Sequence, residues 1–170
     1  MNRSIHSHLL FWPIFTAGLL LDLWSKAAVF RWFENNSRDN FTIIEDFLSF
    51  RLALNSGAAF GIAEGQRWLL IAVSIAALGV VLTVFFFDTA QRKIITITLA
   101  LLAAGICGNL YDRLFNNGLV RDFIDVVYWP GKHWPAFNVA DSLLCIAVGL
   151  LFLSSIFSRR LGQKRAQQQK

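Results

Sequence analysis

Four long apolar runs divide the chain and restrict what it can fold into. Each run is long enough to cross a bilayer as a helix, which takes roughly 20 residues. Only three charged residues, Asp22, Lys26 and Asp141, lie inside these runs. Hydrophobic residues make up 55% of the chain and charged residues 16%, which argues against a soluble domain, a disordered chain or a disulfide-stapled scaffold. The predicted spans are residues 9–30, 68–87, 94–111 and 137–157.

The distribution of basic residues predicts how the four spans are oriented. An even number of spans places both termini on one side of the membrane. The segments 1–8, 88–93 and the basic tail 158–170 hold eight Lys and Arg residues, whereas the longer segments 31–67 and 112–136 hold seven. Because dense Lys and Arg stay cytoplasmic, both termini should be inside and both long loops outside. The net charge of +5 then reflects topology, and no nucleic-acid partner is predicted.

The predicted fold class is an all-α polytopic membrane protein with four transmembrane helices, a small extracytoplasmic β-sheet and an interfacial segment. The 170 residues should form a single membrane domain, since we find no internal repeat or Gly/Ser linker. In the first outer loop, residues 48–54 alternate with a period of two, as a half-buried strand does, and a partner is expected around residues 41–44. In the second, Tyr128, Trp129 and Trp134 are typical of the membrane interface.

Ionisable residues at membrane depth are expensive and mark candidate functional sites. Asp141 lies in the first turns of the fourth span, where a carboxylate could also be a helix N-terminal charge favoured by the macrodipole. Asp122 lies in VRDFID, and a return of the chain to the same surface would bring it close to Asp141. Of two carboxylates at one semi-dry site, one keeps a proton while the other takes one from water, as in an aspartic peptidase. Spacing alone does not exclude Asp112 or Asp125, and outer-loop acids are often only solvated charges.

Polar residues within and at the ends of the spans have a structural interpretation. Asp22 and Lys26 are four residues apart on the first helix, so they share a face and should neutralise each other in the bilayer. The string GNLYDR closes the third span and contains Asn109, Asp112 and Arg113. It could be an interhelical polar clamp or part of a substrate site.

Three further polar positions carry two interpretations each. Asn55 and Gly57 in NSGAAFG could form a simple turn, or could place backbone and amide groups over a peptide. Asn138 lies three residues before Asp141 and therefore on the same helix face. It could orient that carboxylate or cap the start of the helix.

The ordered set of motifs resembles the lipoprotein signal peptidase family, also called signal peptidase II. Between Asp22 and Ser142 the chain carries a D-x-x-x-K pair, LNSGAAFG, GNLYDR, VRDFID and PAFNVADS, in that order. The set is far more specific than any one string. The resemblance implies a bacterial inner-membrane aspartic endopeptidase that removes the signal peptide from prolipoproteins, cutting before the Cys that carries diacylglycerol.

The resemblance also assigns roles to residues and partners. It implies that Asp122 and Asp141 are the catalytic dyad, near the outer face of the membrane. The implied partners are diacylglyceryl-modified prolipoproteins and membrane lipids, and we expect a monomer without a cofactor. No metal is expected either, because the histidines lie on opposite faces of the membrane: His6, His8 and His133. The implied substrate-binding residues are Asn55, Gly57, Asn109, Arg113 and Asn138, and the implied structural polar residues are Asp22, Lys26 and Asp112.

The chain departs from the family pattern at a few positions. Leu23 replaces a frequent Gln, NSG stands for the commoner NTG, and Arg121 replaces a usually apolar residue. A cation beside Asp122 would favour its charged form and lower its pKa from about 3.9, unless Arg121 points to lipid headgroups.

Two alternative classes stay open at this point. A small transporter or ion pathway would use Asp22, Lys26 and Asp141 as a relay, but the sequence has no inverted repeat or pair of Gly/Pro-broken spans. A non-catalytic membrane scaffold would depend on small residues of the third span, such as Gly105 and Gly108. The ordered polar motifs favour the peptidase.

Overall fold

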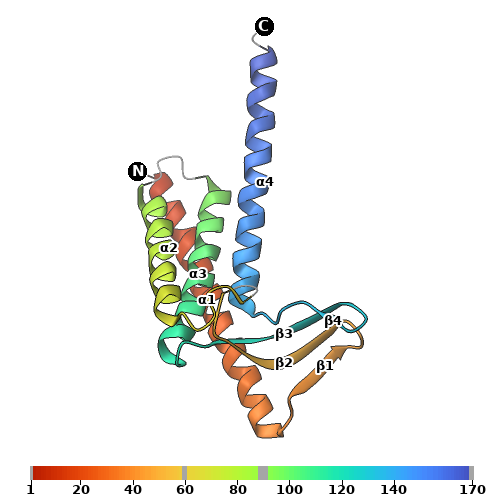
Figure 1. Ribbon diagram of the computed structural model, residues 1–170. Coiled ribbons are helices and arrows are strands. Elements are labelled where there is room, and N and C mark those ends of the chain that lie inside the picture. Colours follow the sequence, from red (N-terminus) through yellow and green to blue (C-terminus); the bar gives the residue numbers. More distant parts are fainter. Residues whose placement is uncertain (1, 59–60, 88–91, 169–170) are drawn as a thin grey trace.

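The computed structural model describes residues 2–58, 61–87 and 92–168 (Figure 1). Residues 59–60 of the NSGAAFG motif and 88–91 of the predicted inner loop lie outside the described residues, as do the side chains of the basic tail. The described elements are α1 (Asn2–Asn36), β1 (Asn40–Ile44), β2 (Leu48–Asn55), α2 (Arg67–Phe87), α3 (Lys93–Phe115), β3 (Val120–Trp129), β4 (Lys132–His133) and α4 (Val139–Gln168).

The four predicted spans are confirmed as helices that are long and apolar enough to cross a membrane. Three of them run past the predicted boundaries: α1 continues to Asn36, α3 to Phe115 and α4 to Gln168. Parts of the expected outer loops and of the tail are therefore helical. The predicted C-terminal ends of these helices fall short because hydropathy falls near the first charged side chain, whereas intrahelical hydrogen bonds continue through polar turns.

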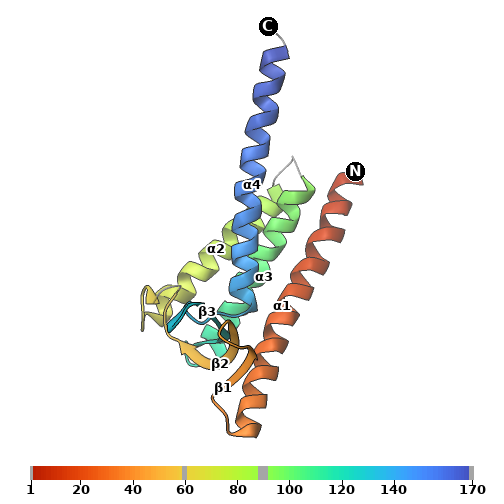
Figure 2. The ribbon, with the colours of Figure 1, turned by 90° about the vertical axis from the view of Figure 1, so that its right-hand side faces the viewer.

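The central helix of the bundle is α3, which packs against α1, α2 and α4 (Figures 1 and 2). Small residues allow the close approach. A Cβ added at Gly105 would lie 2.7 Å from the carbonyl oxygen of Ala140, and one added at Gly108 would collide with the carboxylate of Asp22. α3 therefore brings polar groups of α1 and α4 to one level of the bundle.

The other end of the bundle is held by apolar side chains. Phe11 and Phe85 stack with ring centroids 4.0 Å apart, next to the buried Leu99 and Ala100. Many large apolar side chains face outward, for example Trp68 and Phe87, which are 73% and 79% exposed. Such surfaces suit lipid rather than water.

A four-stranded antiparallel sheet in the order β1-β2-β3-β4 lies at the end of the bundle where α4 begins. The start of α1 and the end of α4 lie at the opposite end (Figure 1). The predicted strand and its partner are confirmed, with Phe41 opposite Phe50. A register shift between Phe50 and Ala53 marks an irregularity in the pairing of β2 with β3.

The second outer loop contributes more than the expected interfacial segment. Val120–Trp129 forms β3, which pairs along β2 and turns at Gly131 into β4. The sequence pattern missed this strand because buried carboxylates interrupt its apolar residues. Tyr128 and Trp129 remain exposed, and their depth in a membrane stays a prediction.

Candidate active site

Asp141 is fixed by the first turn of α4. Asn138 precedes the helix, and its Oδ1 accepts a hydrogen bond from the Asp141 N–H at 3.0 Å. In return, Asp141 Oδ2 accepts the Asn138 N–H at 3.1 Å. This reciprocal pair has the geometry of a capping box, with Asp in the place of the usual Glu or Gln. Asn138 therefore does both things the sequence left open: it caps the helix and orients the carboxylate.

Asn109 on α3 holds the second oxygen of Asp141. Its Nδ2 donates to Asp141 Oδ1 at 2.7 Å. Its own Oδ1 accepts from Lys26 Nζ and from Asn138 Nδ2, each at 3.0 Å. Because two donors surround that oxygen, the amide has one orientation, with its NH₂ toward Asp141.

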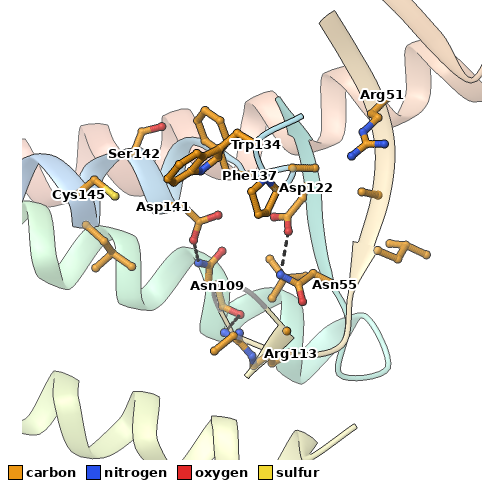
Figure 3. A pocket seen from close by; sticks show the side chains of 18 of the residues that line it. Arg51, Asn55, Asn109, Arg113, Asp122, Trp134, Phe137, Asp141, Ser142 and Cys145 are labelled. Atoms are coloured by element: carbon orange, nitrogen blue, oxygen red, sulfur yellow. Dashed lines mark hydrogen bonds between the residues drawn. The ribbon is translucent and has the colours of Figure 1, made fainter. Parts of the chain in front are cut away.

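Asp122 comes to the same place from the start of β3, as the third residue of the strand. Its Oδ1 accepts from Asn138 Nδ2 at 2.7 Å and its Oδ2 from Asn55 Nδ2 at 3.0 Å (Figure 3). Asn138 thus contacts both acids, which brings the two predicted aspartates together. Burial, followed by the negative charge of Asp141, raises the pKa of Asp122 to about 7, against the lowering effect of the two amide hydrogen bonds.

The NSG motif forms a turn that positions Asn55. Gly57 donates its N–H to Asn55 Oδ1 at 2.9 Å, and the Gly57 carbonyl accepts from Arg113 Nη2 at 2.9 Å. A Cβ at Gly57 would lie 3.0 Å from the carbonyl oxygen of Ile62. The turn interpretation and the site interpretation are therefore compatible, since the turn aims the Asn55 amide at Asp122.

Fully buried charges support the site from the bundle side. Lys26 Nζ lies 2.8 Å from Asp22 Oδ2 and 3.3 Å from Asp112 Oδ2, and these three side chains have no exposed surface. Asp22 also accepts the N–H of Ala140 at 2.8 Å. Because Lys26 donates to Asn109 as well, one cation links this cluster to the Asp141 carboxylate.

Arg121 does not approach Asp122 as its position in the sequence suggested. Its Nη2 and Nε donate to Asp112 Oδ1 at 2.7 and 3.1 Å. It lines a second cavity of about 400 Å³, on the other side of Leu54. The expected lowering of the Asp122 pKa is therefore wrong, because successive side chains of a strand point to opposite faces.

Asp125, the competing acid of VRDFID, belongs to a different cluster. Its Oδ2 accepts from Ser49 Oγ at 3.2 Å and lies 2.8 Å from His133 Nδ1, while its Oδ1 lies 3.2 Å from Arg51 Nε. The side chain is 2% exposed and is not part of the cavity wall that holds Asp122. The geometry separates the two acids that spacing left undistinguished.

A cavity of about 1010 Å³ contains both carboxylates. Asn55, Asn109 and Arg113 line it, whereas Gly57 and Asn138 support lining residues from behind. Arg51, on the sheet, also lines it and was missed, because an Arg in a half-buried strand is usually a solvated side chain. Within the described part of the chain, no three His, Cys, Asp or Glu side chains gather as they would around a metal ion.

Comparison with known proteins decides the family. Residues 14–157 match the family described as Signal peptidase (SPase) II. The chain belongs to the signal peptidase II family. Membership makes it a peptidase of the membrane, and every motif discussed above lies within the matched residues.

Relatives and solved structures agree with this family. The lipoprotein signal peptidase of Rhodopirellula baltica is 39% identical over 161 residues, which cover 86% of this chain and 71% of that protein. The one from Neisseria meningitidis serogroup C is 34% identical over 172 residues, covering 96% of this chain and 99% of that protein. A structure described as a bacterial membrane enzyme at 2.3 Å resolution aligns with a TM-score of 0.76 and 29% identity, over 91% of this chain and 89% of that one.

Proposed function

We propose that this protein is an aspartic endopeptidase that removes signal peptides from prolipoproteins, cleaving before the diacylglyceryl-modified Cys. The observation that carries the proposal is the pair of carboxylates, Asp122 and Asp141, joined through Asn138 in the wall of one large cavity. Membership in the signal peptidase II family supplies the reaction class, peptide hydrolysis. Relatives named lipoprotein signal peptidase support the substrate.

The two acids would share one proton, and their surroundings divide the roles. Asp122, whose pKa burial raises to about 7, holds the shared proton up to about neutral pH. Asp141, at the start of α4, accepts hydrogen bonds from a backbone N–H and from an amide NH₂, and it then carries the negative charge of the pair. Asp141 is therefore the general base and Asp122 the general acid.

The reaction then balances without another group. Asp141 takes a proton from a water molecule as the water oxygen forms a bond to the scissile carbonyl carbon. The tetrahedral intermediate collapses by breaking the C–N bond, and the leaving nitrogen takes the proton of Asp122. Transfer of the proton from Asp141 to Asp122 restores the starting dyad. A low-dielectric site strengthens the electrostatic stabilisation of these steps.

The remaining polar residues would hold the dyad and the substrate. Asn109 and Asn138 fix the carboxylates, while Asn55 and Arg113 shape the wall against which the peptide lies. The signal peptide and the acyl chains would follow the α4 wall, where Leu144, Cys145 and Ile146 line the cavity. Asp22, Lys26 and Asp112 would support the fold beneath the site.

The orientation in the cell follows from the charges. We place the protein in the bacterial inner membrane with both termini cytoplasmic and the cavity near the outer face, because Lys and Arg are densest at the termini. We take the chain as one membrane domain that acts as a monomer among membrane lipids.

Cleavage by the purified protein in detergent tests the proposal. A precursor is offered with and without the diacylglyceryl group, to the wild type, Asp122→Asn and Asp141→Asn. We expect cleavage of the lipidated precursor only, lost in both variants. Asp39→Asn is the matched control, since it makes the same chemical change at an exposed acid outside the cavity, and it should cleave normally. Retained cleavage by either dyad variant refutes the assignment, and no cleavage by a folded wild type reopens the transporter and the scaffold.

A further inference from the structure

The cavity changes its chemistry from one end to the other. Along α4 its wall consists largely of apolar side chains, including Leu144 and Ile146. At the sheet its wall includes the guanidinium of Arg51, from β2. Figure 3 shows Arg51 and Cys145 on opposite sides of the two carboxylates. A substrate that extends through the whole cavity therefore contacts apolar side chains at the α4 end and the Arg51 cation at the sheet end.

Arg51 is held in place by a buried carboxylate. Its Nε lies 3.2 Å from Asp125 Oδ1, and the Asp125 side chain is 2% exposed. Ser49 and His133 contact the other oxygen of Asp125, so the carboxylate joins β2, β3 and β4. This ion pair restrains the guanidinium without covering it, since 44% of the Arg51 side chain stays exposed.

The terminal groups of Arg51 remain available for a ligand. Among the contacts of the described residues, Arg51 is engaged through Nε alone, which leaves two NH₂ groups. The other guanidinium of the cavity, Arg113, is 7% exposed and donates to the carbonyls of Gly57 and Asn109. Arg51 is thus the lining arginine that can bind an acceptor from outside the chain.

The direction in which the substrate runs through the cavity indicates which hydrogen-bond acceptor reaches Arg51. This step rests on the proposed function. The signal peptide and the acyl chains are apolar and belong at the α4 end. In the proposed orientation, the segment that follows the modified Cys would leave the bilayer at the sheet end of the cavity. An extended segment offers a main-chain carbonyl at every residue, about 3.3 Å apart, whatever its side chains are.

We propose that Arg51 binds a main-chain carbonyl oxygen of the substrate segment that follows the modified Cys. The sheet end of the cavity is then an outer subsite that recognises polypeptide backbone independently of sequence. Asp125 is a positioning residue, because it acts through Arg51 and does not line the cavity.

A series of lipidated precursors of different length tests this subsite. The analogues end about one, three and six residues after the Cys, which spans about 3 to 20 Å of extended chain. For the wild type, kcat/KM should rise once the segment reaches Arg51. Arg51→Gln should lower kcat/KM about tenfold on the longest analogue, the effect of losing a charge-assisted hydrogen bond, and should leave the shortest analogue unchanged. Arg51→Lys should keep part of the gain.

Controls separate this proposal from the dyad and from the fold. Arg38→Gln changes an exposed arginine outside the cavity and should match the wild type at every length. Asp125→Asn should reproduce a weaker form of the length-dependent loss. If that variant does not fold, the two Arg51 variants still decide the matter.

The outcomes that overturn the subsite differ from those that overturn the function. An equal loss by Arg51→Gln at all lengths means a structural role, and no loss on the longest analogue means no contact; either result ends the proposal. In both cases the wild type and Arg51→Gln still cleave some precursor, so the proposed function stands. If the wild type cleaves none of the series, the proposed function has failed instead.

Discussion

Replacing Asp122 by Asn should change the stability of the protein in a way that depends on pH. Asp122 has a pKa of about 7 in the folded protein and near 3.8 ordinarily, because burial disfavours its charge. The folded state therefore binds more protons than the unfolded state between these values, and wild-type stability falls as the pH rises through this window. The Asn side chain does not titrate, so the variant escapes this loss.

The size of the effect follows from the same pKa. At about 1.4 kcal/mol per pH unit, a rise from 3.8 to about 7 corresponds to an upper bound of about 4 kcal/mol. A loss of stability acts against this gain at every pH, because the Asn side chain has one acceptor oxygen for Asn55 and Asn138 where the carboxyl group of Asp122 has two oxygens. One lost hydrogen bond costs about 1 kcal/mol. The variant should be slightly less stable than the wild type near pH 4 and more stable above pH 7.

Thermal unfolding in detergent, followed by tryptophan fluorescence between pH 4 and 8, measures this difference. The midpoint of Asp122→Asn minus that of the wild type should rise with pH and level off above pH 7. Asp39→Asn, at an exposed position, should give a difference that hardly changes with pH. A difference for Asp122→Asn that stays flat or falls from pH 5 to 8 would show that Asp122 is ionised at neutral pH, and would refute its role as the acid.

Two further predictions use the same structure. Wild-type kcat/KM should fall about tenfold per pH unit above pH 7 as Asp122 loses its proton. Asn55→Ala should move this fall to higher pH, because the Asn55 hydrogen bond lowers the pKa of Asp122. A pH profile that Asn55→Ala leaves unmoved contradicts the assignment of Asp122 as the acid. Gly108→Ala should cost about 1–3 kcal/mol of stability, because the new Cβ meets the Asp22 carboxylate and lies 3.2 Å from the Cβ of Ala140. At the control position Gly149, also within a helix, the new Cβ meets nothing within 4 Å, so Gly149→Ala should be at least as stable as the wild type.

The helices of this fold were predictable because lipid imposes one strong rule. A span must be apolar over about 20 residues, and four runs satisfy this. Their ends were not predictable from hydropathy, since α1 continues through Arg31 and Glu34 as a polar helix. β3 was missed for a related reason, because buried acids interrupt the apolar pattern that identifies a strand.

The candidate site was predictable as a set of residues but not as a set of contacts. The motifs named Asp122 and Asp141, and the spacing of Asn138 placed it on the face of Asp141. Nothing in the sequence showed that Lys26 would reach Asn109, 83 positions away, or that Arg121 would pair with Asp112. Such contacts depend on how α1 and β3 pack against α3, which local patterns do not encode.

The proposed division of labour between the two aspartates depends on which element carries each of them. Asp141 belongs to the first turn of a 30-residue helix, where backbone N–H groups and the dipole favour negative charge. Asp122 lies near the start of β3, and the donors that reach its carboxylate are two side-chain amides. Burial is therefore the main influence on the pKa of Asp122, whereas Asp141 accepts a backbone N–H at the start of a helix. In the proposed mechanism, the same type of side chain would serve as acid at one position and as base at the other, because one aspartate is buried in β3 and the other begins α4.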